Sequence, residues 1–301
     1  MNKIRPPRAT FNQLRTLEAV VRLGSVTRAA KELHLTQPTV SAQIQELQLS
    51  LDTDLLEPIG RGIRPTESAH LLRQTALDIF ARWQRFEEDM LAVNGLERGT
   101  LRIAGVTTTE YFIAQWLSDY TDNHPGIEIE LAVENRDAVV KYLSDDVIEL
   151  AVMMMPPQNL SLETLPVMHN PLVLICALDH PWVRKKKRLS RQALSGAPML
   201  MRERGSGTRL TTEAYLNEHH LELNVRATLG SNEAIKHAVA AGLGLAIVSR
   251  HALSKDPAKE GLAIVPMTGF PIPRQWQLVW RKDRRLSLAA KRFIDDVRGR
   301  Y

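Results

Sequence analysis

The chain has 301 residues, which is long enough for two or three domains with their own cores. Hydrophobic residues make up 44% and charged residues 24%, as in ordinary globular proteins, and no apolar run reaches the ~18 residues of a membrane span. The net charge of +5 permits a polyanionic partner. Cys176 is the single cysteine, so an internal disulfide is excluded. No secretory signal is visible, and we expect a cytoplasmic protein without a membrane partner.

The first helix is predicted over residues 11–23, FNQLRTLEAVVRL, with Gly24 as its stop. Residues 25–51, SVTRAAKELHLTQPTVSAQIQELQLSL, predict two further short helices joined by a tight turn. Ser25 and Thr36 suit the N-cap position, and Pro38 suits a first helical turn. In the second of these helices an apolar stripe recurs at helical spacing, formed by Val40, Ile44, Leu47 and Leu51.

The face opposite that stripe is polar but almost uncharged, which suits hydrogen bonding to base edges in a major groove. The stretch DTDLLEPIGRGIRPT then predicts a hairpin, or wing, with two arginines near its tip. Arginine there suits phosphate contact or a narrow minor groove. We therefore predict binding to double-stranded DNA through Thr27, Arg28, Lys31, Gln37, Pro38, Thr39, Ser41, Gln45, Arg61 and Arg64.

A long helix is predicted from Thr66, as its cap, to about Leu96. Its apolar residues alternate at spacings of three and four, the pattern of a coiled-coil seam. One alternative is a single helix lying on its own domain. We favour dimerisation through Leu72, Ala76, Ile79, Trp83, Phe86 and Met90. A homodimer or homotetramer would present paired recognition helices and prefer a DNA site with dyad symmetry.

Beyond Gly95 and Gly99 apolar strands alternate with helices, which predicts an α/β region with mainly parallel sheets. The predicted strands are LRIAGV, IEIELAV, ELAVMM, LVLICAL, PMLM, VRATL, LAIVS and QLVW. The predicted helices cover residues 113–123, 137–143, 208–219 and 231–241.

Four polar stretches follow strands or open helices in this region, where α/β proteins bind ligands and helix N-termini attract anions. Hydroxyls and arginines together favour a small anionic metabolite, either phosphorylated or an organic acid. The predicted effector-binding residues are Thr107, Thr108, Thr109, Asn135, Arg136, Arg202, Ser206, Gly207, Thr208, Ser231 and Asn232. A capped turn is the alternative for the segment GSGT.

Catalysis has no visible basis, because no nucleophile, base and orienting group occur at recognisable spacing. His180, His219 and His220 lack metal-ligand spacing, so no metal site and no cofactor are predicted. Met153–Met155 reads as buried strand and core, and Gly242-Leu-Gly244 as a helix stop rather than a dinucleotide fingerprint.

The segment AAKELHLTQPTVSAQIQELQ resembles the winged helix-turn-helix of LysR-type transcriptional regulators. The resemblance extends over essentially the whole chain. It implies a fold with an N-terminal all-α winged helix-turn-helix, a long linker helix and a two-lobed, periplasmic-binding-protein-like α/β region. The implied domains are 1–66 for DNA binding, 67–97 for dimerisation and 98–301 for the effector, with lobe I at 98–170 and 271–301 and lobe II at 171–270.

The wing departs from the usual family pattern at Leu56, Pro58 and Pro65, and Ala42 stands where many relatives carry arginine. These departures predict a weaker or differently placed phosphate grip.

Within the family, LETLPVMHNPLVLICALDHP, MRERGSGTRLTTEAYL and LGSNEAIKHAVAAGLGLAIVSRHAL look most like regulators of carbon-fixation operons. We therefore expect a non-enzymatic, DNA-binding regulator controlled by a small anionic metabolite, with RNA polymerase as a candidate partner. A LysR-type regulator of an unrelated operon is one alternative. A small-molecule-binding α/β protein without a regulatory role is another.

Overall fold

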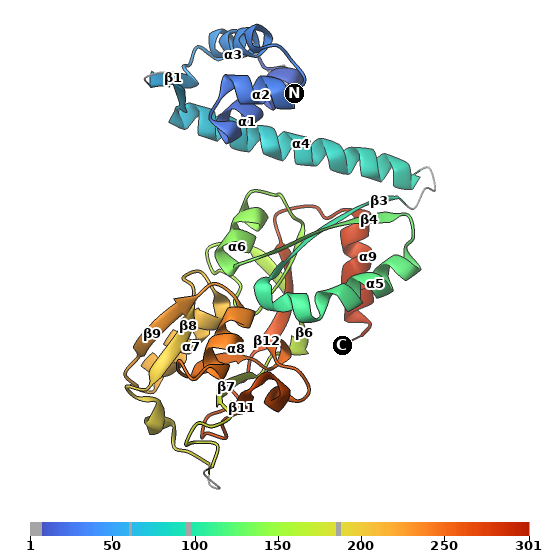
Figure 1. The fold of residues 1–301 in the computed structure, drawn as a ribbon. Coiled ribbons are helices and arrows are strands. Elements are labelled where there is room, and N and C mark those ends of the chain that lie inside the picture. Colours follow the sequence, from blue (N-terminus) through green and yellow to red (C-terminus); the bar gives the residue numbers. More distant parts are fainter. Residues whose placement is uncertain (1–7, 60–61, 94–97, 185–187, 301) are drawn as a thin grey trace. The chain divides into compact units, whose positions relative to one another are not determined.

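The chain divides into two compact units, Met1–Glu87 and Glu88–Tyr301. The computed structural model describes residues 8–59, 62–93, 98–184 and 188–300 (Figure 1). Arg61, one of the predicted DNA contacts, lies outside the described residues. No helix in these ranges is long and apolar enough to cross a membrane.

The first unit is a bundle of short helices followed by a two-stranded hairpin and a long helix. Its helices are α1 (Phe11–Leu23), α2 (Val26–Glu32), α3 (Gln37–Leu51) and α4 (Glu67–Val93), and its strands are β1 (Leu56–Ile59) and β2 (Gly62–Pro65). The strands pair antiparallel, with Leu56 opposite Pro65, so the predicted wing is confirmed.

Local capping defines the helix-turn-helix. The hydroxyl of Ser25 accepts from the backbone N–H of Arg28, and that of Thr36 accepts from Thr39, so both predicted caps are confirmed. Gly24 ends α1 at φ +60°, a left-handed conformation that costs glycine little. The core of the unit joins α1, α2, α3 and the start of α4 through Leu17, Val20, Ala29, Ala30, Val40, Ile44, Leu47, Leu55 and Ala69.

The apolar seam of α4 has two distinct parts. Ala76 is fully buried in the single chain, and its role as a dimer contact stays a prediction. Trp83 and Phe86 are half-exposed and lie against each other with ring centroids 5.4 Å apart, and Phe11 of α1 packs edge-on against Trp83. The open part of the seam consists of Ile79, Trp83, Phe86 and Met90.

The second unit contains two sheet-based lobes. Lobe I is built on a five-stranded sheet of order β4-β3-β5-β12-β6. Its elements are β3 (Gly99–Val106), α5 (Ile113–Asn123), β4 (Ile127–Glu134), α6 (Arg136–Ser144), β5 (Leu150–Met153), β6 (Leu162–His169), β12 (Gln275–Arg281) and α9 (Leu288–Arg298).

Lobe II is built on a three-stranded sheet, β10-β7-β11, and a two-stranded sheet, β8-β9. Its elements are β7 (Leu172–Ala177), β8 (Pro198–Arg202), α7 (Gly207–Glu218), β9 (Asn224–Leu229), α8 (Asn232–Ala240), β10 (Ala246–Ser249) and β11 (Leu262–Ile264). The 3-10 turns of both lobes are η1 (Thr107–Tyr111), η2 (Arg191–Leu194), η3 (Arg250–Ala252) and η4 (Pro257–Glu260).

Lobe I has helices on both faces of its sheet. Along β3, Leu101 and Ile103 belong to the core that includes residues of α5 and α9, whereas Ala104 belongs to the core that includes α6. This alternation follows from the two-residue period of a strand. The hydroxyl of Tyr120 on α5 donates to the carbonyl of Ala289 on α9 at 2.9 Å, which ties the two helices together.

Two chain segments connect the lobes, and they lie side by side. Leu172 and Ile272 exchange two backbone hydrogen bonds of 3.0 and 2.8 Å, and the N–H of Asn170 donates to the carbonyl of Arg274 at 2.7 Å. The outgoing and returning segments thus form a short antiparallel ribbon. The predicted domain boundaries remain predictions, since nothing in this geometry fixes them to the residue.

The expectation of mainly parallel sheets is wrong. β3 pairs parallel with β4 and β5, and β8 with β9, but β12 is antiparallel to β5 and β6, and β7 is antiparallel to β10 and β11. The reason is topological: β12 enters the sheet of lobe I only after the chain has visited lobe II, and it runs in the reverse direction. Strand β6 was not predicted, because Pro166 interrupts its pattern and is tolerated only at the sheet edge where β6 lies.

Candidate functional site

The candidate DNA-binding surface is the outer face of α3. Val40, Ile44 and Leu47 are buried, so the remaining face of the helix points outward. Figure 1 shows α3 lying next to α2, with β1 to their left in the view. The exposed side chains include most of the predicted contacts, namely Thr27, Arg28, Lys31, Gln37, Pro38, Thr39, Gln45 and Arg64, and Ser41 is half-buried.

Some of these side chains already have partners in the chain. The guanidinium of Arg28 donates to the carbonyl of Leu23, and Arg64 pairs with Glu57 across the hairpin at 2.9 Å. Both members of the Arg64 pair are exposed, and such surface pairs contribute little to stability. A DNA phosphate can therefore replace Glu57 at small cost.

The second candidate site is a small cavity between lobes I and II. Its lining comes from the ends of β3, β5 and β8 and from the starts of α6 and α7. The lining residues are Val106, Thr107, Thr108, Asn135, Arg136, Met153, Met154, Met155, Arg202, Ser206, Gly207, Thr208 and Trp276. The room inside the cavity is about 20 Å³, enough for about one water molecule, so a larger ligand needs the lining to move apart.

Most of the predicted effector residues thus meet in one cavity, and three do not. Ser231 caps α8 by accepting from the N–H of Ala234 at 3.1 Å. Thr109 packs against Gly105, whose Cβ, if present, would lie 2.0 Å from the threonine hydroxyl oxygen, so this side chain faces the strand and not the cavity. Asn232 does not line the cavity, but it forms hydrogen bonds with two residues that do, Arg202 and Thr108.

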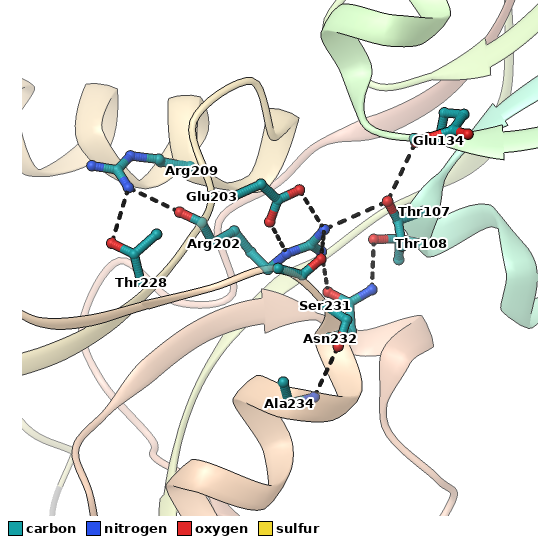
Figure 2. A network of polar contacts seen from close by, with 11 residues as sticks. Thr107, Thr108, Glu134, Arg202, Glu203, Arg209, Thr228, Ser231, Asn232 and Ala234 are labelled. Atoms are coloured by element: carbon teal, nitrogen blue, oxygen red, sulfur yellow. Dashed lines mark hydrogen bonds and ion pairs between the residues drawn. The ribbon is translucent and has the colours of Figure 1, made fainter.

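Arg202 is the buried charge of the cavity, and Figure 2 shows how it is held. Its Nε and Nη2 donate to the carboxylate of Glu203 at 2.8 and 2.9 Å, and its Nη1 donates to Oδ1 of Asn232 at 2.7 Å. A buried guanidinium needs such partners, because removing a charge from water is costly unless it is paired.

The same network joins the two lobes. Nη2 of Arg202 lies 3.5 Å from the hydroxyl oxygen of Thr107, and the amide of Asn232 donates to the hydroxyl of Thr108 at 3.1 Å. Beside it, the hydroxyl of Tyr111 on η1 donates to Glu233 on α8 at 2.7 Å. Burial and this hydrogen bond raise the pKa of Tyr111 well above its ordinary value, so the hydroxyl keeps its proton near neutral pH.

The start of α7 supplies an anion-binding element. Ser206 is its N-cap residue but makes no side-chain capping bond, and the first N–H groups of a helix carry partial positive charge. Arg136 of lobe I reaches over this helix start: its Cδ would lie 3.9 Å from a Cβ placed on Gly207. Its Nε donates to the carbonyl of Met155 at 2.7 Å and its Nη1 to Asp137 at 3.2 Å.

The sequence did not single out the apolar part of the lining. Met153 and Met154 are buried, as their core interpretation required, yet they also border the cavity together with Met155 and Trp276. The signal that could have found the methionines is their position at the carboxyl end of β5, beside the carboxyl end of β3. In the described ranges no cluster of His, Cys, Asp or Glu could hold a metal ion.

Comparison with known proteins identifies the family. Residues 11–70 match the bacterial regulatory helix-turn-helix proteins of the lysR family, and residues 94–301 match the LysR substrate binding domain. The HTH-type transcriptional activator CmpR of Synechocystis sp. is 37% identical over 95% of this chain and 94% of its own length. A RuBisCO operon transcriptional regulator of Acidithiobacillus ferrooxidans is 36% identical over 95% and 93%.

Comparison with solved structures finds the same family. The regulatory domain of Synechocystis CcmR, in complex with 2-PG, has a TM-score of 0.64 and 36% identity over 67% of this chain and 97% of that domain. Full-length CbnR in complex with target DNA has a TM-score of 0.72 over 97% of this chain and all of that one, and at 22% identity it shows the fold alone. The chain belongs to the LysR family and is a DNA-binding transcriptional regulator. The alternative of a binding protein without a regulatory role is thereby excluded.

Gly205 provides a test of the cleft geometry. It adopts φ +84°, and an added Cβ would lie 2.7 Å from Oδ2 of Asp137 in the other lobe. Gly205→Ala should lower the free energy of unfolding by about 1–3 kcal/mol, because the left-handed backbone is strained for alanine. Calorimetry or urea unfolding of the full chain measures this loss.

Gly230→Ala is the matched control, since its added Cβ would meet nothing within 4 Å and its backbone is not left-handed. Equal losses in the two variants would contradict the geometry at Gly205.

Proposed function

We propose that this protein regulates a carbon-fixation operon in response to a small phosphorylated acid bound between its lobes. The observation that carries the proposal is the convergence of Arg136, Arg202 and the start of α7 on one cavity that also presents threonine hydroxyls. Arginine and helix N-termini are the groups that proteins use for phosphate. Support comes from the RuBisCO operon regulators among its relatives and from the 2-PG complex of CcmR.

The proposed effector is 2-phosphoglycolate, the ligand of the CcmR domain. It should raise the melting temperature of the full-length protein, and at 100 times Kd the gain is about 2.7 kcal/mol. Arg136→Ala should abolish the shift by removing a cation from lobe I. Arg298→Ala removes an exposed arginine of α9 and should leave the shift unchanged. No shift with 2-phosphoglycolate in the wild type would overturn this choice of effector.

We further propose that α3 lies in the major groove, with Gln37, Thr39, Ser41 and Gln45 toward the bases. Thr27, Arg28, Lys31 and Arg64 would hold the backbone. A regulator of this kind would act in the cytoplasm, where its DNA is. All of these side chains except the half-buried Ser41 are exposed, which supports the assignment, and the CbnR–DNA complex shows that the same fold binds DNA in a relative.

Base readers and phosphate binders should respond differently to truncation. Gln37→Ala should cost about 1–3 kcal/mol at one base position and relax preference there. Arg64→Ala should weaken binding to all sequences alike and reduce the salt slope by about one. Quantitative gel shifts on specific and scrambled duplexes at several salt concentrations measure both. Loss of sequence preference in Arg64→Ala would contradict the assignment.

The exposed end of the α4 seam is proposed as the dimer contact, because half-exposed Trp83 and Phe86 form an apolar strip that water solvates poorly. Phe86→Asp should shift the protein from dimer or tetramer toward monomer, measured by light scattering after size exclusion. Leu71→Asp, at an exposed position of α4 outside the seam, is the matched control. A wild-type monomer, or an unchanged assembly in Phe86→Asp, would exclude this interface.

A further inference from the structure

The phosphate-binding edge of Arg202 is already occupied by a neighbour in the chain. Nε and Nη2 form the side of the guanidinium that grips a carboxylate or phosphate with two parallel hydrogen bonds. Both donate to Glu203, at 2.8 and 2.9 Å, while Nη1 is committed to Asn232. A ligand anion can therefore bind this edge of Arg202 with two hydrogen bonds only where the carboxylate of Glu203 moves away.

The two members of this pair differ in their access to water. The side chain of Arg202 is 3% exposed and that of Glu203 is 25% exposed. The backbone of Glu203 is fixed by a hydrogen bond from its N–H to the carbonyl of Leu229 at 3.1 Å. Its carboxylate can rotate into solvent while the main chain stays in place, whereas Arg202 has no comparable route.

The charges around the cavity nearly cancel in the structure. Arg136 is paired with Asp137 and Arg202 with Glu203, so each of the two arginines that line the cavity is paired with the carboxylate of the next residue in the chain. A ligand with a single carboxylate would replace Glu203 by a group of equal charge. A phosphate, with a charge of about −1.5 to −2, offers Arg202 a stronger partner.

We propose that Glu203 is a tethered competitor of the effector, holding Arg202 until a phosphorylated acid displaces its carboxylate into water. The inference rests on the proposed effector site and explains why that site would select phosphorylated acids over acids of lower charge. Because the competitor is part of the chain, its effective concentration is high, and weakly charged acids bind poorly. In Figure 2 the carboxylate of Glu203 is seen on one side of the Arg202 guanidinium, with Thr107 and Asn232 reached from the others.

The test uses the full-length protein, isothermal titration calorimetry, and 2-phosphoglycolate and inorganic phosphate as separate probes. Glu203→Gln keeps the shape of the side chain and removes its charge. It should bind 2-phosphoglycolate roughly tenfold more tightly than wild type, the factor expected when a charged hydrogen-bonding competitor is lost. Inorganic phosphate should gain in the same direction. A gain in affinity is informative, because damage to the fold would produce a loss.

Glu213→Gln is the matched control. It removes the same charge from the same lobe, but Glu213 pairs with Arg209, which does not line the cavity. Its affinity should stay within about twofold of wild type, a difference below 0.5 kcal/mol at about 1.4 kcal/mol per tenfold.

The outcomes separate the two proposals. Unchanged or weaker binding in Glu203→Gln, with normal binding by wild type, would overturn the competitor and leave the effector site standing. An equal gain in Glu213→Gln would reduce the effect to general electrostatics and also overturn it. Absence of binding by wild type and Glu203→Gln with both probes would overturn the effector site together with the competitor.

Discussion

The buried guanidinium of Arg202 constrains the whole effector region. A charge with almost no access to water must find partners on every side, and the partners it finds lie in both lobes. Glu203 and Asn232 hold it from lobe II, and Thr107 approaches it from lobe I. The position of one lobe against the other is thereby coupled to the choice of hydrogen-bond partners of Arg202. A ligand that offers Arg202 a different partner changes that balance, and it can do so only to the extent that it binds the two arrangements with different affinity.

The helix-turn-helix was accessible from sequence because its signals are local. Each signal lies inside or next to the helix that it predicts: the caps are Ser25 for α2 and Thr36 for α3, and the apolar stripe of α3 is Val40, Ile44 and Leu47. Most residues of the cavity could be predicted for a related reason. Strand ends and helix starts can be recognised in the sequence, and parallel strands bring their carboxyl ends to one edge of the sheet. Thr107, Arg136 and Ser206 are far apart in the chain and meet as expected.

Other features could not be predicted because they depend on distant segments. The direction of β12 follows from the path of the chain through lobe II. Ala76 is buried by the packing of α4 within the single chain, and the periodicity of α4 alone cannot distinguish such a residue from a dimer contact. Trp276 borders the cavity because its strand inserts beside β5, about 120 residues away in the chain. The role of Glu203 is hidden for another reason. A carboxylate next to an arginine in sequence is commonplace, and only the bidentate geometry distinguishes a pair that blocks a binding edge.

Cys176 has a practical consequence for studying how the lobes move. It is buried in β7, and burial raises the pKa of its thiol to about 11, so at neutral pH almost no thiolate is present to react. The native chain is therefore nearly inert toward maleimide and methanethiosulfonate reagents. Introduced surface cysteines, one on each lobe, would accept spectroscopic labels without first removing a residue from the core.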